Sequence, residues 1–399
     1  MDLEGIMEKE ARYHLGTYQR FPAVFEKGEG CYLFDSQGNS YLDLISGISV
    51  NLLGYGYLPL VRAIQEEVNN LIHVSNLFYS RPQVELAERL VEKSGFARVF
   101  FSNSGAEANE VALKMARFYG HRKHKDRYKY LSFYRSFHGR TFLTLALTGQ
   151  EKFHQDLDPL PDGILFASLN HLEEVEQVLD DKVCAIIVEP IQGEGGIYPS
   201  SVEFLRGLRQ LCDQRDIILI FDEVQCGMGR TGSLFAFEHF GVRPDIVTLA
   251  KGLGGGLPLG AVLVNDKIVE ITKKGDQGST FGGNPICARS ACVVIDKISE
   301  EDFLAEVREK GNYLGERLKQ LAKQFSSLIT EVRGLGLMWG IDLPPHARWL
   351  SQKLGEKRIL VNAVSDHTVR FLPPLVIKKE EIDLLVENLE EILASSDWQ

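Results

Sequence analysis

Short apolar runs alternate with segments of helical periodicity through the middle of this chain, and that alternation constrains the fold more than any other feature. The apolar runs are RVFFSNSG (98–105), YKYLSFY (128–134), CAIIVEP (184–190), IILIFDE (217–223), DIVTLAK (245–251) and GAVLVN (260–265). Segments 84–95, 107–120 and 201–214 carry apolar residues at helical spacing. Strands that alternate with helices predict an α/β fold with a mostly parallel, buried sheet.

The pattern changes after about residue 285. Two longer helical segments, 300–325 and 378–394, flank the short strand-like pieces EVRGLGLMWGIDL and TVRFLPPLVI. Near the N-terminus, GCYLFDSQGNSYLDL predicts two short strands about a Gln-Gly-Asn turn. We therefore expect a large domain formed by 51–284, a smaller α+β domain formed by 285–399, and an N-terminal segment, 1–50, that packs with the smaller domain.

Charge and composition disfavour several classes of function. A formal net charge of −11 argues against nucleic acid or an anionic membrane as the main partner. No apolar run approaches the roughly 20 residues that span a bilayer, and the start lacks an apolar signal core, so we expect a cytoplasmic protein. The six cysteines have no C-x-x-C spacing, which predicts reduced, buried thiols.

The first candidate site is the turn Ser104-Gly105-Ala106, where a predicted strand ends and a helix begins. Free backbone N–H groups and the helix dipole at such a turn favour binding of an anion, and a phosphate group is the ligand we expect. An ordinary capped helix would show the same residues. The turn therefore indicates a phosphate site only in combination with other features.

Asp222 ends the very apolar run IILIF, and Glu223 follows it. A carboxylate at that point is costly unless it meets a cation or a hydrogen-bond donor. A buried structural ion pair or a metal ligand are the alternatives. No cluster of His, Asp or Glu with ligand spacing stands nearby, so we expect no metal.

Lys251 ends the next apolar run, and a glycine-rich stretch, GLGGG, follows it. A lysine in a partly desolvated site has a lowered pKa and becomes a nucleophilic amine. The glycines let backbone and a flat ligand approach closely. Neither G-x-x-x-x-G-K-[ST] nor a helix-opening G-x-G-x-x-G is present, which excludes a standard nucleotide loop. A solvated lysine at a strand end is the ordinary alternative.

Taken together, these three features fit one ligand, pyridoxal 5'-phosphate. It has a phosphate for the Ser104-Gly105-Ala106 turn and an aldehyde that can form a Schiff base with Lys251. Its ring nitrogen carries a proton that Asp222 can hold, which keeps the ring able to accept electrons.

From about residue 20 to 390, the chain resembles the class III pyridoxal-phosphate-dependent aminotransferases of fold type I. The motifs that carry this resemblance are SNSGAEANE, SFHGRT, EPIQGEGG, IFDEVQCGMGRTG, PDIVTLAKGLGGGLPLGA, GSTFGGNP and VRFLPPLVI. It implies a fold type I transferase with a mostly parallel seven-stranded sheet between helices. Within the family, the motifs are most similar to those of members that act on acetylornithine.

The resemblance also implies roles for residues around the cofactor. Phe137 would stack on one face of the ring, Val224 would cover the other, and Gln225 would reach the ring hydroxyl. Thr280 would come from the partner subunit and bind the phosphate. A homodimer would then be needed for a complete site.

Four residues are implied as substrate contacts. Ser279 and Arg140 would contact the amine substrate, with Arg140 taking a carboxylate of acetylornithine, for which a planar guanidinium is suited. Arg370 resembles the arginine that binds the α-carboxylate of glutamate, and Glu194 the glutamate that pairs with it. A Glu194–Arg370 pair that opens and closes would let one site take both substrates.

The sequence departs from the family at two places. The usual G-H-x-H-P stretch reads GYGYLP, with Tyr55 and Tyr57 in place of histidines. Near Ile48, the segment SGISVN lacks the tyrosine that ornithine δ-aminotransferases carry for free ornithine. That absence favours an acylated substrate.

The implied reaction is a ping-pong transfer of the ω-amino group between N2-acetyl-L-ornithine and 2-oxoglutarate, a step of arginine synthesis. It gives N-acetyl-L-glutamate 5-semialdehyde and L-glutamate, with Lys251 moving the proton. Other class III enzymes acting on succinyldiaminopimelate, ornithine, 4-aminobutyrate or a substrate linked to an amino-group carrier are alternatives. Two further alternatives are a glutamate-1-semialdehyde aminomutase and a non-catalytic binding protein on the same scaffold. The presence of both Lys251 and Asp222 disfavours the non-catalytic binding protein.

Overall fold

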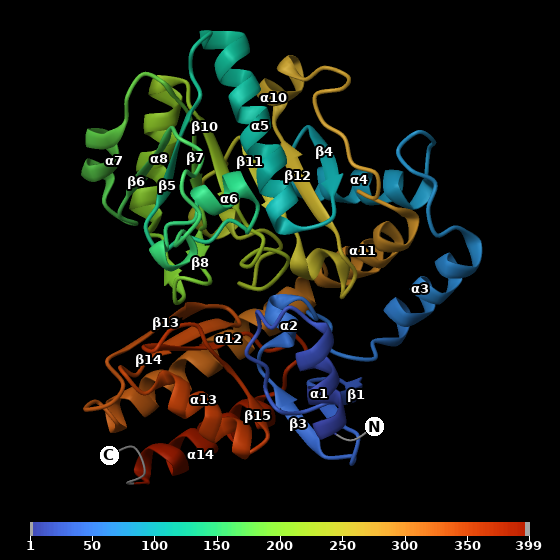
Figure 1. The fold of residues 1–399 in the computed structure, drawn as a ribbon, viewed down its shortest axis with the longest axis vertical. Coiled ribbons are helices and arrows are strands. Elements are labelled where there is room, and N and C mark those ends of the chain that lie inside the picture. The colour runs from blue at the N-terminus through green and yellow to red at the C-terminus, as the bar shows by residue number, and fades with distance from the viewer. Residues whose placement is uncertain (1–2, 396–399) are drawn as a thin grey trace.

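The larger part of the molecule is built around a seven-stranded sheet, whose strands lie in the order β4-β12-β11-β10-β7-β5-β6 (Figure 1). The computed structural model describes residues 3–395. The strands are β4 (Arg98–Ser102), β5 (Lys129–Phe133), β6 (Ile164–Ala167), β7 (Val183–Val188), β10 (Ile218–Asp222), β11 (Ile246–Leu249) and β12 (Gly260–Val264). Only the two pairings of β12 are antiparallel. The predicted α/β fold with a mostly parallel seven-stranded sheet is confirmed.

Helices cover both faces of this sheet because neighbouring strand residues point to opposite sides and both are apolar. α5 (Gly105–His124) covers one face, where its Ala112 joins Ile187 and Ile220 in one buried cluster. α4 (Arg81–Ser94) and α8 (Val202–Arg215) lie on the other, where Leu208 and Leu219 share a second cluster. The shorter helical elements of this part are α6 (Phe142–Ala146), η1 (Glu151–Phe153), α7 (Leu172–Val178), α9 (Phe237–Phe240), η2 (Lys251–Gly254) and α10 (Asp266–Ile271).

β6 is the strand of this sheet that the apolar pattern did not predict. Its four residues follow Pro161, Asp162 and Gly163, and so short a run is not distinguishable from a loop by periodicity. It is placed by parallel pairing with β5, which supplies an edge for it to join.

The N-terminal segment and the C-terminal part share a sheet. β1 (Phe25–Glu29), β2 (Tyr32–Asp35) and β3 (Ser40–Asp43) continue into β15 (Ile359–Leu360), which pairs with β3 in parallel. β13 (Glu331–Leu335), β14 (Met338–Asp342), β17 (Thr368–Phe371) and β16 (Asn362–Ala363) form a further sheet in that order. α12 (Glu301–Gln324), α13 (Ala347–Glu356) and α14 (Lys379–Ala394) pack around these strands (Figure 1).

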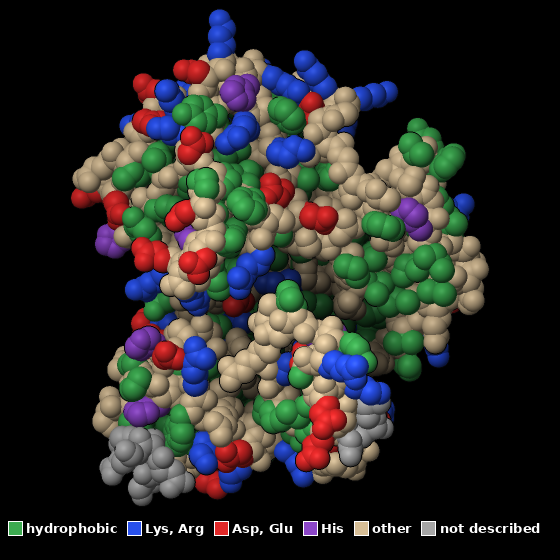
Figure 2. All heavy atoms as spheres, in the orientation of Figure 1, with side chains coloured by type: hydrophobic (Ala, Val, Ile, Leu, Met, Phe, Trp, Pro, Cys, Tyr) green, Lys and Arg blue, Asp and Glu red, His purple; other side chains and the backbone are tan. Residues whose placement is uncertain are grey.

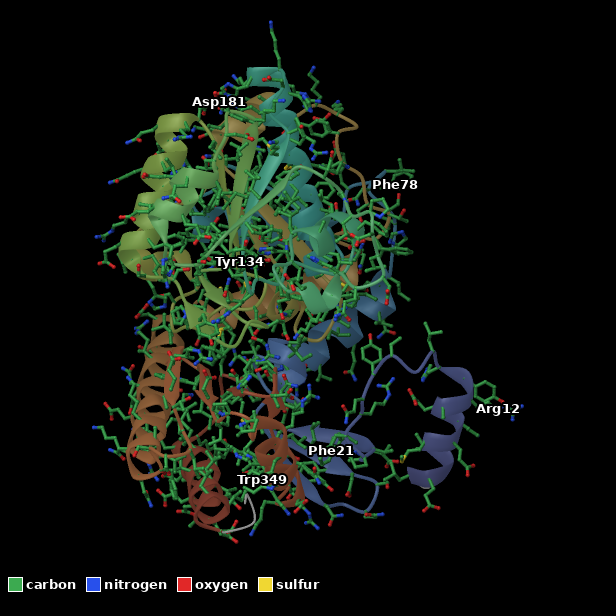
Figure 3. All side chains as sticks on the ribbon, turned by 60° about the vertical axis from the view of Figure 1, so that its left-hand side comes forward. Arg12, Phe21, Phe78, Tyr134, Asp181 and Trp349 are labelled. Carbon is green, nitrogen blue, oxygen red and sulfur yellow. The ribbon has the colours of Figure 1, made fainter. Side chains whose placement is uncertain are left out.

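The domain limits at residues 50 and 284 stay a prediction. α11 (Pro285–Ile298) begins at the second limit and packs against α3 (Leu58–Asn70) and α4. α1 (Leu3–Tyr13) has no buried residue and stands away from the body, as the position of Arg12 in Figure 3 shows. Between residues 3 and 395, none of the helices combines the length and apolar character needed to cross a bilayer. A cytoplasmic location stays a prediction.

Candidate active site

A cavity of about 250 Å³ opens where several strands of the large sheet end. Asp222 is the last residue of β10, Lys251 follows β11, and Gly105 opens the helix after β4. In sheets of this kind, ligands bind beyond the carboxyl ends of the strands. Of the residues singled out in the sequence, eight line the cavity: Gly105, Ala106, Phe137, Arg140, Asp222, Val224, Gln225 and Lys251.

Four further residues line the cavity without having been predicted: Asn109, His138, Gly139 and Glu189. Signals for three of them were present in the sequence. Asn109 lies one helical turn after Gly105 and so faces the same side. His138 stands between Phe137 and Arg140, and Glu189 directly follows β7.

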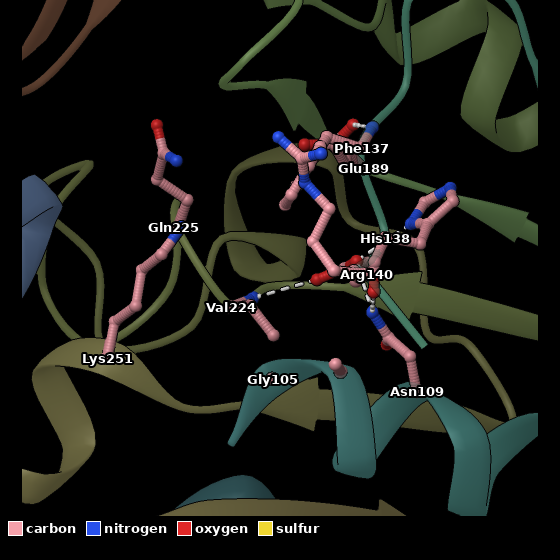
Figure 4. A pocket seen from close by; sticks show the side chains of 12 residues that line it. Gly105, Asn109, Phe137, His138, Arg140, Glu189, Val224, Gln225 and Lys251 are labelled. Atoms are coloured by element: carbon pink, nitrogen blue, oxygen red, sulfur yellow. Dashed lines mark hydrogen bonds and ion pairs between the residues drawn. The ribbon is translucent and has the colours of Figure 1, made fainter. Parts of the chain in front are cut away.

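Lys251 opens η2 in a left-handed backbone conformation, with φ of 45°. The backbone of a residue other than glycine is strained in that conformation, and strain of this kind is concentrated at functional sites. Burial lowers the pKa of Lys251 below its ordinary value, and Glu194 opposes that effect. Figure 4 shows Lys251 and Gln225 on one side of the cavity, with Phe137 and Arg140 across it.

Asp222 is 4 % exposed, and its carboxylate meets three hydrogen-bond donors. Asn109 Nδ2 donates to its Oδ2 at 2.7 Å, and His138 Nδ1 lies 2.8 Å from the same oxygen. The N–H of Val224 donates to Oδ1 at 3.1 Å. These donors compensate the burial of the carboxylate and fix its direction.

The start of α5 has the geometry of an anion cradle. Ser104 is the N-cap, and its Oγ accepts from the N–H of Glu107 at 3.2 Å. The N–H groups of Gly105 and Ala106 therefore open the helix without an acceptor inside it. A Cβ on Gly105 would lie 2.7 Å from Val224 Cγ1, so glycine allows Val224 to close over the cavity at this point.

Glu189 joins two loops of the site. Its Oε2 accepts from the N–H of Phe137 at 3.0 Å, and its Oε1 from the N–H of Gly193 at 3.1 Å. Burial raises the pKa of Glu189 above its ordinary value, while His138 and these two N–H donors oppose the rise. The carboxyl therefore holds the loop of Phe137 in place relative to the loop that carries Glu194.

Arg140 is exposed at the rim of the cavity. Its Cζ lies 4.0 Å from the ring centroid of Phe153 and 5.8 Å from that of Phe137. Among the described residues, no carboxylate pairs with it and no atom accepts a hydrogen bond from it. The guanidinium is thus positioned by aromatic stacking while its N–H groups stay available.

Arg370 and Glu194 form the expected ion pair beside the cavity. Arg370 is 1 % exposed, and its Nη1 donates to Glu194 Oε1 at 2.7 Å. Gln225 bridges the pair, since its Oε1 accepts from Nη1 at 3.0 Å and its Nε2 donates to Glu194 at 3.1 Å. Burial acts to raise the pKa of Glu194, but Arg370 and Lys251 outweigh it and lower the pKa to about 2.

Ser279 and Thr280 lie outside the cavity lining. Ser279 Oγ accepts from the N–H of Gly282 at 2.9 Å and from Asn103 Nδ2 at 3.3 Å. Thr280 is exposed on the same loop, beside the exposed ring of Phe281. Neither side chain lines this cavity.

The first tyrosine of the GYGYLP departure anchors its loop to the N-terminal sheet. Tyr55 Oη donates to Asp43 Oδ2 at 2.6 Å, and the Tyr55 ring lies where a Cβ on Gly28 would be, 2.4 Å from Cγ. Tyr57 is the N-cap residue of α3. The loop therefore connects the N-terminal sheet to α3 at a place away from the cavity.

Lys251 is half-buried at this cavity, and the carboxylate of Asp222 and the first N–H groups of α5 face the same space. This arrangement is that of an enzyme that uses pyridoxal 5'-phosphate. The chain belongs to the class III aminotransferases, because the family model "Aminotransferase class-III" matches residues 15–393. It is 46% identical to the acetylornithine aminotransferase of Methanocaldococcus jannaschii over 393 residues, 98% of each chain.

Two solved structures show the same fold. The N-acetylornithine aminotransferase of Stenotrophomonas maltophilia matches with a TM-score of 0.83 and 36% identity, over 97% of this chain and 98% of that one. An ornithine aminotransferase of Toxoplasma gondii, in which pyridoxal phosphate partly occupies the active site, matches with a TM-score of 0.93 and 29% identity. That match covers 98% of this chain and 94% of that one.

The residues present fit the cofactor of this family. The Lys251 amine, the Asp222 carboxylate and the free N–H groups of α5 supply one group each for its aldehyde, ring nitrogen and phosphate. Gly105 leaves the space that a Cβ would fill beside Val224. Among residues 3–395, no group of three or more His, Cys, Asp and Glu side chains is arranged to hold a metal ion.

Proposed function

We propose that this enzyme transfers the ω-amino group of N2-acetyl-L-ornithine to 2-oxoglutarate, giving N-acetyl-L-glutamate 5-semialdehyde and L-glutamate. The observation that carries the proposal is a pair of guanidiniums in different states at one cavity. Arg140 is open at the rim, whereas Arg370 is masked by Glu194. One arginine is then ready for a carboxylate of acetylornithine, and the other is uncovered only for glutamate.

We propose that Lys251 and Asp222 are the catalytic residues of this reaction. When bound, the cofactor supplies an electron sink for the carbon that loses its proton. Asp222 would hold the proton of the ring nitrogen, with His138 and Asn109 orienting its carboxylate. Lys251 is the one amine among the lining residues, so it is the group that takes a proton from the substrate carbon and returns it.

The binding roles of the other residues belong to the same proposal. The N–H groups of Gly105 and Ala106, with Ser104 as N-cap, would hold the phosphate. Phe137 and Val224 would enclose the ring, and Gln225 would reach its hydroxyl. Ser279 would contact the amine substrate.

The Glu194–Arg370 pair would give the site two modes. With the pair closed, Arg370 is neutralised and the cavity takes a substrate that presents no α-carboxylate there. Arg370 Nε is buried and finds no acceptor within residues 3–395, so the guanidinium keeps a donor ready for the carboxylate of glutamate. Once Glu194 moves aside, Nη1 becomes available as well.

Replacing Glu194 with alanine should favour glutamate over acetylornithine. Without Glu194, Arg370 is no longer held in an ion pair and is available to glutamate in every molecule. The KM for glutamate should therefore fall by about 5–10-fold relative to the KM for acetylornithine. Steady-state kinetics with each substrate measures the ratio. The matched control is Glu194→Gln, which keeps a hydrogen bond to Arg370 without the charge. Its KM ratio should lie between those of the wild type and Glu194→Ala. An unchanged ratio in Glu194→Ala contradicts the switch.

A half-reaction tests the proposed substrate. Purified enzyme mixed with acetylornithine alone should convert the absorbance of its bound cofactor to that of the amine form. Ornithine, succinyldiaminopimelate and 4-aminobutyrate should react more slowly, and a faster reaction with any of them would reassign the substrate. Turnover without an added oxo acid would indicate an aminomutase, and no absorbance change with any amine would indicate a binding protein.

We propose a homodimer on the evidence of an exposed apolar face. Hydrophobic side chains gather over α3 and the chain that follows it (Figure 2). We call this surface the 58–84 face, and its exposed members are Leu58, Val61, Val68, Leu71, Ile72, Leu77, Phe78, Tyr79 and Val84. The rings of His73 and Phe281 pack at a tilt, with 5.0 Å between their centroids, which joins the face to the loop of Thr280. A second copy seated there would bring Thr280 to its partner's phosphate.

Leu77→Asp should separate the subunits and weaken cofactor retention. Leu77 is 86 % exposed in one subunit, so a charge there harms an interface more than it harms the fold. Sedimentation should show a monomer, and equilibrium dialysis should show cofactor affinity reduced by about 10-fold or more, from the lost phosphate contact. Leu384→Asp, on α14, is the control and should leave both unchanged. A Leu77→Asp protein that stays dimeric places the interface elsewhere.

A further inference from the structure

Arg230 lies in the loop after β10 and is fully buried, with 0 % of its surface exposed. Among the described residues, no carboxylate lies within ion-pair distance of its guanidinium. The Asp43 carboxylate interacts with this charge electrostatically without forming a direct ion pair. A buried cation with no direct ion pair is costly unless oxygen atoms satisfy its N–H groups. The oxygens that do so come from three separate segments of the chain.

The guanidinium reaches all three segments at once. Nε donates to Ser49 Oγ at 3.0 Å, and Nη2 donates to Ser46 Oγ at 3.4 Å. Nη1 donates to the carbonyl of Leu337 at 2.9 Å and to that of Pro373 at 2.5 Å. Arg230 thus ties its own loop to the N-terminal segment, to the β13–β14 turn and to the chain that leaves β17.

The N-terminal partner of Arg230 is α2 (Ser46–Ser49), a turn in the left-handed conformation. Its φ values are 48°, 64°, 64° and 63° along Ser46, Gly47, Ile48 and Ser49. Such a conformation is strained for each residue other than glycine, because Cβ comes too close to the following carbonyl oxygen. The turn therefore needs external bonds, and Arg230 supplies two of them.

Other bonds tie this turn to the segment of Arg370. Ser46 Oγ donates to the carbonyl of Leu372 at 2.7 Å, directly before the Pro373 carbonyl that Arg230 holds. Arg370 stands two residues earlier, on β17. The position of Arg370 along its strand is thereby linked to the left-handed turn.

The same turn also contacts the cavity. Ser49 Oγ lies 3.3 Å from the carbonyl of Gln225, the residue that bridges Glu194 and Arg370. α2 also packs against η2, which begins with Lys251. Arg230 bonds both to the turn beside Gln225 and to the segment of Arg370.

We propose that Arg230 is a positioning residue that sets the place of Arg370 relative to Gln225, and so controls recognition of the α-carboxylate of glutamate and 2-oxoglutarate. This inference rests on the proposed function only in giving Arg370 that carboxylate. When Glu194 moves aside, Arg370 loses its strongest partner. Gln225 and Asn362 still hold its guanidinium. Its position also depends on the backbone that carries it, to which Arg230 is bonded through the carbonyl of Pro373.

Arg230→Lys tests the proposal. One ammonium cannot reach Ser49, Leu337 and Pro373 together, because it lacks the fork of the guanidinium. Since misplacement by about 1 Å costs up to roughly 10²-fold, KM for glutamate should rise by about 10–100-fold while KM for the ω-amine changes little. The absorbance of the bound cofactor should stay as in the wild-type enzyme.

The matched control is Arg308→Lys. Arg308 Nη1 donates to the carbonyl of Gly232 in the same loop at 2.7 Å, but it makes no bond to α2 or to the chain after β17. A merely structural role for Arg230 would lower the melting temperature and affect both substrates alike. Equal glutamate-to-ω-amine ratios in the two variants would overturn the inference.

A second variant covers the case in which Arg230→Lys does not fold. Ser49→Ala removes one bond of Arg230 and the contact with Gln225, and leaves the carbonyl contacts of Arg230 in place. It should raise KM for glutamate by about 3-fold, in the same direction. An unchanged KM ratio in Ser49→Ala overturns the inference. Failure of the proposed substrate would appear separately, as a wild-type enzyme that does not react with acetylornithine.

Discussion

Replacing Lys251 with alanine should lower turnover by at least about 10³-fold, because the variant loses both the amine that joins the cofactor and the group that moves the proton. Cofactor should still bind, since the start of α5 and Asp222 are untouched. Borohydride treatment followed by peptide mapping should label position 251 in the wild-type enzyme and no position in the variant.

The control for this experiment is Lys353→Ala, on the exposed side of α13. It should keep wild-type turnover and wild-type labelling. A label found at a lysine other than 251, or turnover retained by Lys251→Ala within about 10-fold of the wild type, would contradict the assignment of the catalytic amine.

Asp222→Asn should reduce kcat by about 10²–10³-fold with cofactor still bound. The change removes the negative charge that holds the proton of the ring nitrogen. It also puts amide hydrogens where Asn109 Nδ2 and His138 Nδ1 now meet Oδ2. That conflict of donors should lower the free energy of unfolding by about 1–3 kcal/mol, measured by urea denaturation.

Asp245→Asn separates the two effects of that substitution. Asp245 is also buried, and its carboxylate accepts from Arg209 Nη1 and from the N–H of Leu219, each at 2.9 Å. It precedes β11 and so lies at the end of the sheet opposite the cavity. The control should lose stability and keep kcat. Equal losses of kcat in both variants would mean that Asp222 acts through stability alone.

Strand periodicity located the centre of the site from sequence alone. Asp222 and Lys251 each end an apolar run, and parallel neighbouring strands bring such ends to one edge. The start of α5 followed from the same logic, because a turn directly after β4 exposes the first N–H groups of a helix. The family motifs then indicated four more lining residues, Phe137, Arg140, Val224 and Gln225.

What periodicity could not supply were contacts between loops. Glu189 holds the N–H of Phe137 and the N–H of Gly193, and no local pattern shows that these two loops meet. The left-handed turn at 46–49 was equally hidden, since SGIS contains a single glycine and the turn depends on distant bonds from Arg230. Tertiary contacts outweighed local preference at both places.

The antiparallel direction of β12 has a consequence for how the two ends of the cofactor site are spaced. β12 enters the sheet at the edge where its neighbours leave it, so the chain after Lys251 doubles back inside the site through its glycine run. At the start of β12, a Cβ on Gly260 would lie 2.5 Å from the carbonyl of Ser104. Backbone thus rests on backbone between the amine anchor and the phosphate turn. Main-chain pairing therefore sets the distance between Lys251 and the phosphate turn at Ser104. That distance should stay the same in variants whose core substitutions loosen the side-chain packing around it.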